Sequence, residues 1–151
     1  MRTRRGFTLI ELLVTIAIVA LLVSIAMPSY RRYVMASNRA EAWAALLQVQ
    51  SGEEKFYMQN SAYTTDLTDP PGQGGLGIAL TGSGGALYTA NNNYAISIAT
   101  AACNPAAAAV CGYTATATAA NNQVNDNAAC LTFTIDSLGQ RTPADSTGCW
   151  R

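Results

Sequence analysis

The chain has 151 residues, enough for one globular domain; half of them are apolar and only 12% are charged. Nine Lys and Arg balance nine Asp and Glu, but three of the arginines lie in the first six residues. Loss of that segment would leave six cations against nine acids, which argues against a general nucleic-acid-binding surface. The sequence has no His, the commonest general base and a frequent zinc ligand, so we expect no enzyme, metal or cofactor.

The N-terminus joins a short basic segment to a long apolar run. Three arginines precede Gly6, and residues 7–27 contain one charged side chain, that of Glu11. At about 1.5 Å per residue, such a run forms a helix long enough to cross a bilayer of roughly 30 Å. A carboxylate inside hydrocarbon costs at least ~2.5–3.5 kcal/mol and is usually functional. The sequence therefore predicts a membrane helix in which Glu11 has a specific task.

Cleavage after Gly6 would provide Glu11 with a cationic partner. It would leave a free ammonium on Phe7, and the Phe7 of a neighbouring copy could then pair with Glu11. The alternative is an ordinary secretory signal cut after residues 24–26, which leaves Glu11 unexplained. Because basic flanks stay in the cytoplasm, residues beyond Pro28 are expected outside it, where disulfides persist.

Residues 29–60 are predicted to continue as a helix, since a Pro inside a helix kinks it without necessarily ending it. Two apolar faces follow helical spacing. One comprises Ala36, Ala40, Trp43 and Leu47, and the other comprises Ala42, Leu46, Val49 and Phe56. Two faces indicate contact with a sheet of the same chain and with helices of other copies; burial within one domain is the alternative.

The remainder of the chain predicts a flexible loop followed by a small sheet. Residues 65–93 are rich in Gly and contain a Pro-Pro-Gly turn signal. Apolar residues alternate with small or polar ones in 94–99, 113–119 and 131–135, and 140–142 is a candidate fourth strand. We therefore expect an α+β fold, with one long N-terminal helix packed on an antiparallel sheet.

The stretch Gly6-Phe7-Thr8-Leu9-Ile10-Glu11-Leu12-Leu13 closely resembles the leader and N-terminal helix of type IV pilins. The resemblance implies cleavage by prepilin peptidase between Gly6 and Phe7, N-methylation of Phe7 and an assembly role for Glu11. Pro28 stands where the family usually has Pro. Ala20 stands where the family often has Gly, so the local unwinding of the helix seen in filaments of the family is less expected between Ala20 and Pro28. Residues 37–41 and 54–64 resemble PilE-type minor pilins.

On this reading, residues 1–6 are the leader, 7–28 the transmembrane and assembly helix, and 29–151 a periplasmic head. The head would contain helix 29–60, loop 65–93 and sheet 94–151.

The four cysteines can be connected in three ways, and we favour the arrangement that contains the bonds Cys103–Cys111 and Cys130–Cys149. The first would clamp a connection between two strands, and the second would fix the C-terminal tail. The chain's ending resembles the disulfide-bounded C-terminal region of type IV pilins. Asp126 with its flanking asparagines offers too few ligands for a calcium loop. The two tryptophans are interpreted as packing residues.

The first functional hypothesis is a structural subunit of a type IV pilus, serving pilus assembly, twitching motility or adhesion. The implied partners are prepilin peptidase, major and minor pilins, the inner-membrane assembly platform and, before assembly, the membrane. Alternatives are a type II secretion pseudopilin, a single-pass anchored protein, and a competence pilin that binds DNA. The last would need a basic patch, and beyond the helix arginines only Lys55, Arg141 and Arg151 are available.

Overall fold

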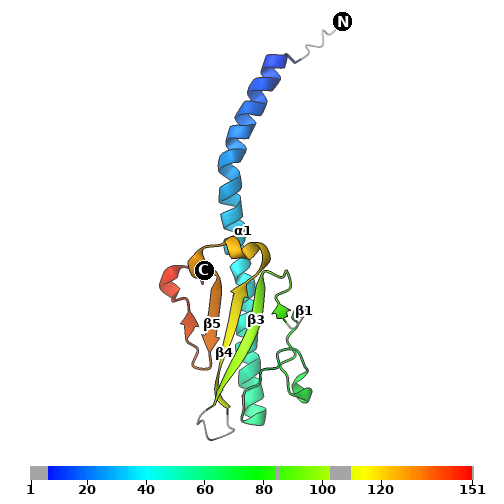
Figure 1. The fold of residues 1–151 in the computed structure, drawn as a ribbon, viewed down its shortest axis with the longest axis vertical. Coiled ribbons are helices and arrows are strands. Elements are labelled where there is room, and N and C mark those ends of the chain that lie inside the picture. Colours follow the sequence, from blue (N-terminus) through cyan, green and yellow to red (C-terminus); the bar gives the residue numbers. More distant parts are fainter. Residues whose placement is uncertain (1–6, 84–85, 103–109, 151) are drawn as a thin grey trace. The chain divides into compact units, whose positions relative to one another are not determined.

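The computed structural model describes residues 7–83, 86–102 and 110–150. Its longest element is helix α1, Leu9–Asn60, which continues through Pro28. The chain divides into two compact units, one ending at Val34 and the other beginning at Met35. We call the second unit the head and describe each unit by itself. Figure 1 shows the head's strands lying along the second half of α1.

The head's sheet has six antiparallel strands, each bonded to its neighbour in the chain, in the order β1-β2-β3-β4-β5-β6. The strands are β1 Thr81–Ser83, β2 Ala86–Tyr88, β3 Tyr94–Ala102, β4 Val110–Ala119, β5 Thr132–Asp136 and β6 Arg141–Thr142. The predicted α+β fold is thus confirmed, with an antiparallel sheet beside one long helix. Four 3₁₀ helices connect the elements: Pro71–Gln73, Asn121–Asn125, Ala128–Cys130 and Asp145–Thr147.

Alternation along the three central strands directs one row of side chains into the core. In β4, Tyr113, Ala115 and Ala117 are buried, whereas Thr114 between the first two and Thr118 after the third are exposed. A period of two is the geometry of a strand with one buried face. The small side chains of β4 lie opposite larger ones on its neighbours, as in the pairing of Ala117 with Ile96 of β3 and with Phe133 of β5.

Helix α1 closes this core with one of its two apolar faces. Ala42, Leu46 and Val49 are fully buried, whereas Ala40 and Leu47 on the other face are exposed. The head therefore buries one stripe in its own core and covers the second only in part, since Trp43 packs against the core while Ala40 and Leu47 stay exposed. The expected contact of that second stripe with other copies stays a prediction.

The aromatic residues of the tail contribute to the same core. Trp150 stacks on Trp43 with ring centroids 6.1 Å apart and meets the edge of Phe133 at 5.1 Å. A disulfide joins Cys130 to Cys149, one of the two pairings favoured from the sequence, and both cysteines are buried. The other predicted bond, Cys103–Cys111, stays a prediction, because Cys103 lies outside the described residues.

The segment 65–93 differs from the loop expected from its glycines. It contains the 3₁₀ helix Pro71–Gln73 and the first two strands, β1 and β2, so the sheet begins at Thr81 and not at Tyr94. Leu87 of β2 pairs with Ile96 of β3, and this pairing organises a stretch whose composition alone favours a loop. Backbone bonds order the part before β1, with Leu76 N–H donating to Asp66 O at 3.0 Å and Ile78 N–H to Leu67 O at 2.8 Å.

Candidate functional site

The first unit exposes nearly all of its apolar side chains. Phe7, Leu9 and Leu21 keep 79%, 77% and 65% of their surface accessible. The most apolar window of α1 is long enough to cross a membrane and has none of its surface buried within the chain. Burying one such side chain is worth about 1.5–3 kcal/mol, so a helix of this kind is stable only where lipid or other protein covers it.

Glu11 lies in the first turn of this exposed helix. The Thr8 hydroxyl accepts a hydrogen bond from the Glu11 backbone N–H at 3.3 Å, which makes Thr8 the N-cap and Glu11 the third helical residue. A Thr three residues before a Glu is a capping pattern, and a negative charge at a helix N-terminus is favourable. The spacing of Thr8 and Glu11 is a local sequence signal for this helix start.

The other processing and assembly residues have different settings. Gly6 lies outside the described residues, and Phe7 lies just before α1 with an exposed ring. Pro28 is inside the continuous helix, where it offers no N–H to the carbonyl four residues earlier. Glu11 and Pro28 are separated by several turns of α1, so these two residues do not form one site.

A buried ion pair between α1 and the end of the sheet was not predicted. Arg39 donates from Nε and Nη2 to both carboxylate oxygens of Asp126, each at 2.7 Å, and their side chains are 13% and 5% exposed. Burial by itself would raise the pKa of Asp126, but hydrogen bonds from Arg39 and neighbouring groups lower it. Because this carboxylate is engaged by Arg39, it is a structural anchor and not a calcium ligand.

Buried amides and hydroxyls extend this polar contact. Gln123, only 1% exposed, donates to the Met35 carbonyl at 2.9 Å and to the Tyr94 hydroxyl at 3.1 Å. Burial raises the pKa of Tyr94 to about 12. Glu41 accepts from Thr89 Oγ1 at 2.9 Å and from Asn93 Nδ2 at 3.1 Å. These partners lie 29 to 88 residues apart, beyond the reach of local sequence patterns.

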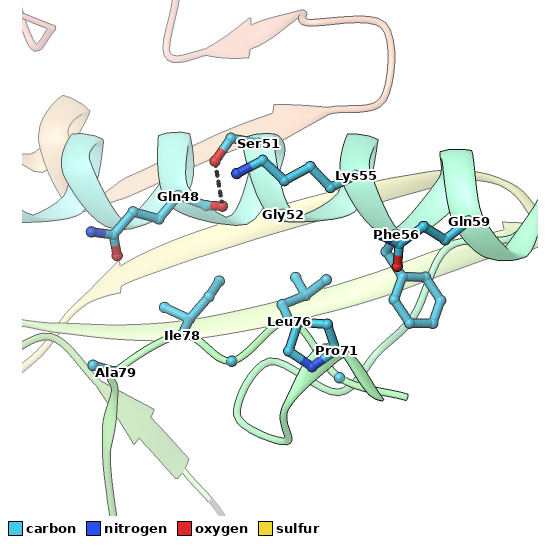
Figure 2. A pocket seen from close by; sticks show the side chains of 12 residues that line it. Gln48, Ser51, Gly52, Lys55, Phe56, Gln59, Pro71, Leu76, Ile78 and Ala79 are labelled. Atoms are coloured by element: carbon cyan, nitrogen blue, oxygen red, sulfur yellow. Dashed lines mark hydrogen bonds between the residues drawn. The ribbon is translucent and has the colours of Figure 1, made fainter. Parts of the chain in front are cut away.

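A groove of about 470 Å³ runs between α1 and the segment 71–79. Figure 2 shows Lys55 extending along α1 toward Ser51, with Leu76 and Ile78 on the facing segment pointing back to the helix. No carboxylate lines the groove, and no described acid forms an ion pair with Lys55. A groove of this composition suits an anionic group next to an apolar one, but the structure does not show what fills it.

The charge of the head bears on nucleic-acid binding. Residues 35–151 contain four cations, Arg39, Lys55, Arg141 and Arg151, against eight Asp and Glu. Arg39 is held by Asp126, and the Arg141 guanidinium lies 5.5 Å from the ring centre of Trp150. Phosphate contacts provide most nonspecific DNA affinity, and this head offers few cations for them.

No described cluster of three or more Cys, Asp or Glu is arranged to hold a metal ion.

Comparisons with known proteins identify the family of this chain. Residues 28–134 match the family described as "Type IV minor pilin ComP, DNA uptake sequence receptor", and residues 1–27 match the "Prokaryotic N-terminal methylation motif". The chain is 34% identical over 65 residues to the fimbrial protein EcpC of Eikenella corrodens, covering 43% of this chain and 42% of that protein. It is also 34% identical over 65 residues to the type IV major pilin protein PilE of Neisseria gonorrhoeae, covering 43% and 39%.

The matches span less than half the length of these two relatives. A solved type IV pilin from Shewanella oneidensis overlaps 78% of this chain and 98% of its own, with 24% identity and a TM-score of 0.49. The family model covers most of the chain, and the methylation motif covers the exposed apolar helix. The chain is therefore a type IV pilin and belongs to the family described as type IV minor pilin ComP.

Proposed function

We propose that this pilin is a minor subunit of a type IV pilus, cut after Gly6, methylated at Phe7 and assembled through its N-terminal helix. The observation that carries the proposal is an apolar helix with no cover within its own chain and with one acid, Glu11, near its start. Cleavage supplies the ammonium that Glu11 lacks. Helices of neighbouring copies can then cover one another in an open, non-closing array.

The proposed course begins in the inner membrane, with the helix spanning it once and the head in the periplasm. Prepilin peptidase removes residues 1–6, and the assembly platform inserts the subunit among major and minor pilins of a pilus that extends outside the cell. The match to a pilin family supports this course over a type II secretion pseudopilin or a simple membrane anchor. The resulting filament would serve motility, adhesion or DNA uptake.

The minor role is supported by the family description, which covers residues 28–134. The relatives named as major pilins align over only 60 and 65 residues. Quantitative mass spectrometry of purified filaments tests this assignment. A minor subunit is far less abundant than the major pilin, and equal or greater abundance would contradict the role.

Replacing Glu11 with Gln tests the assembly mechanism, because Gln keeps the side-chain length and removes the charge. We expect normal membrane insertion and normal processing, with the variant depleted from purified filaments at least tenfold. Thr15→Ala is the matched control on the same exposed helix, where the hydroxyl bonds only the Leu12 carbonyl of its own turn. Incorporation of Glu11→Gln at the wild-type level would refute the role of the charge.

Intact-mass spectrometry tests the processing step independently. The expected mature protein begins at methylated Phe7, and Gly6→Val retains residues 1–6. Working filaments whose subunits begin at Met1 would leave Glu11 without the proposed cation and exclude the mechanism.

A second candidate is a DNA-uptake subunit, favoured by the family's description as a DNA uptake sequence receptor. The acid excess of the head weighs against strong nonspecific binding. Filter binding with the processed full-length protein, using DNAs of different sequence over a range of salt, tests this role. Binding to one sequence that survives added salt supports it, and no binding at low salt dismisses it.

A further inference from the structure

Glu53 is a glutamate at a position where the helix pattern calls for an apolar residue. It continues the buried stripe of Ala42, Leu46 and Val49 at helical spacing, and its side chain is fully buried. A carboxylate in such a place costs several kcal/mol unless it is paired and hydrogen-bonded. Glu53 therefore needs a physical explanation beyond packing.

The hydrogen bonds of Glu53 leave half of its carboxyl group unsatisfied. Its Oε2 accepts the backbone N–H of Thr64 at 3.2 Å. Its Oε1 is buried and has no hydrogen-bond partner among the described residues, and the same holds for the Tyr113 hydroxyl on β4. A neutral carboxyl group, with a proton on its free oxygen, is tolerated in these surroundings far better than an ion.

The groups around Glu53 do not supply a compensating cation. Glu54 follows Glu53 on α1, Tyr63 lies in the segment after the helix, and Tyr113 lies on β4. All three neighbours are themselves acids, so none of them offers a positive charge to an ionised Glu53. Burial raises the pKa of Glu53 to about 7, assisted by Glu54 and opposed by the Thr64 hydrogen bond. The nearest acid of the following segment, Asp66, instead accepts the backbone N–H groups of Thr68 and Asp69.

Thr64 connects Glu53 to the wall of the groove. Its hydroxyl donates to the Gly74 carbonyl at 2.8 Å while its N–H donates to Glu53. Backbone bonds from Leu76 to Asp66 and from Ile78 to Leu67 make the segment 61–80 one connected piece. The state of the Glu53 carboxyl group thus bears on a whole segment and not on one bond.

We propose that Glu53 is a pH-sensitive latch, which holds the segment 61–80 against α1 when neutral and loosens it when ionised. Opening of the segment admits water to the carboxyl group and returns it to ordinary acidity. The open form therefore binds fewer protons than the closed form, so a rise in pH favours opening. With a closed-form pKa of about 7 and an ordinary value of 4.5, the opening equilibrium rises about tenfold per pH unit between these values, about 300-fold in all, and then levels.

Amide hydrogen exchange tests the latch on the processed full-length protein in detergent micelles. Protection factors, corrected for intrinsic exchange, are measured from pH 5 to pH 9 for the segment 61–80 and for the central strands. We expect protection of the segment to fall by about 40-fold from pH 5 to pH 7, and by about 75-fold in all before it levels toward pH 9. The central strands should show no comparable change, because they do not open with the segment.

Glu53→Gln should flatten this profile, since Gln is similar in size and does not titrate. Glu54→Gln, one residue away and exposed, is the matched control and should keep the slope. A pH-independent profile in the wild-type protein, or an unchanged slope in Glu53→Gln, overturns the proposal. Should Glu53→Gln fail to fold, ¹³C titration of the wild-type Glu53 carboxyl group decides. A titration midpoint at the pH where the loss of segment protection levels supports the latch, and a midpoint at a different pH refutes it.

Discussion

Residues 7–34 and the head contain similar kinds of apolar side chain but cover them differently. In the first unit, Ile10 and Leu12 remain 66% and 59% exposed, whereas in the head Leu46 and Phe133 are fully buried. The first unit has hydrogen bonds within its own helix and no core, and the head joins distant segments through a core and an ion pair. The contrast indicates that the head covers its apolar side chains by its own fold, whereas the first unit needs lipid or other protein to cover its apolar side chains.

The largest effect should follow from emptying the centre of the head. Phe133→Ala removes a buried ring that meets Tyr94 and Trp150 edge to face, at 5.9 and 5.1 Å. We expect a loss of about 3–5 kcal/mol in the free energy of unfolding. Near-UV circular dichroism of the full chain in micelles measures it. Membrane insertion of residues 7–27 should not change; a parallel loss of insertion would contradict the separation of the two units.

Removal of the C-terminal disulfide should rank next. The double change Cys130→Ser and Cys149→Ser opens a loop with a sequence separation of 19 and should cost about 3 kcal/mol. Denaturant unfolding of the full chain measures the loss. Because the first unit holds no cysteine, its helicity in micelles is the internal control. An unchanged unfolding midpoint would show that the aromatic packing of Trp150 is sufficient to fix the tail.

Breaking the ion pair tests how the head tolerates buried charge. Asp126→Asn leaves Arg39 without its carboxylate and should cost about 2 kcal/mol at neutral pH. The folded pKa of Asp126 is lowered, so its stabilisation is fully present above pH 3.8 and fades as the pH falls through the lowered value. The difference from wild type should therefore shrink in acid. Asp145→Asn, at an exposed acid, is the control and should have little effect at either pH.

The smallest expected effect is a gain in the stability of the head. Gly52→Ala replaces a helical Gly, and a Cβ there would meet Leu76 carbons at 3.4 Å, an ordinary contact. We expect up to about 1 kcal/mol of added stability. Gly75→Ala is the contrasting variant, because its Cβ would lie 2.2 Å from the Asp69 carbonyl oxygen, and it should destabilise the head. Thermal unfolding of both variants measures the two effects. A lower melting temperature in Gly52→Ala would show that the Leu76 side chain cannot make room for the added methyl group.

The sequence predicts those elements whose pattern is local. Helix 29–60 was expected to end at Asn60, where α1 ends, and the strand expected over 131–135 is observed as Thr132–Asp136. The first two strands were missed because pairing, and not their own composition, makes them extended: β2 pairs with β3, and β1 pairs with β2.

The polar groups of the head show what local sequence patterns cannot predict. Glu53 occupies a core position of an amphipathic helix, and a pattern of apolar residues cannot reveal a buried acid whose partner, Thr64, lies after the helix. The pairing of Arg39 with Asp126 joins residues 87 apart and has no local signature. Glu11 was singled out because a lone charge in an apolar run is conspicuous, although its capping geometry went unnoticed.

The simple order of the sheet has a consequence for how the head is made. Each strand bonds to the strand before it, so hairpins can form one after another along the chain. Cys149 follows β6, so the bond to Cys130 can close only after the residues of the last hairpin have been synthesised. The disulfide thus forms only in a head that already contains all six strands of its sheet.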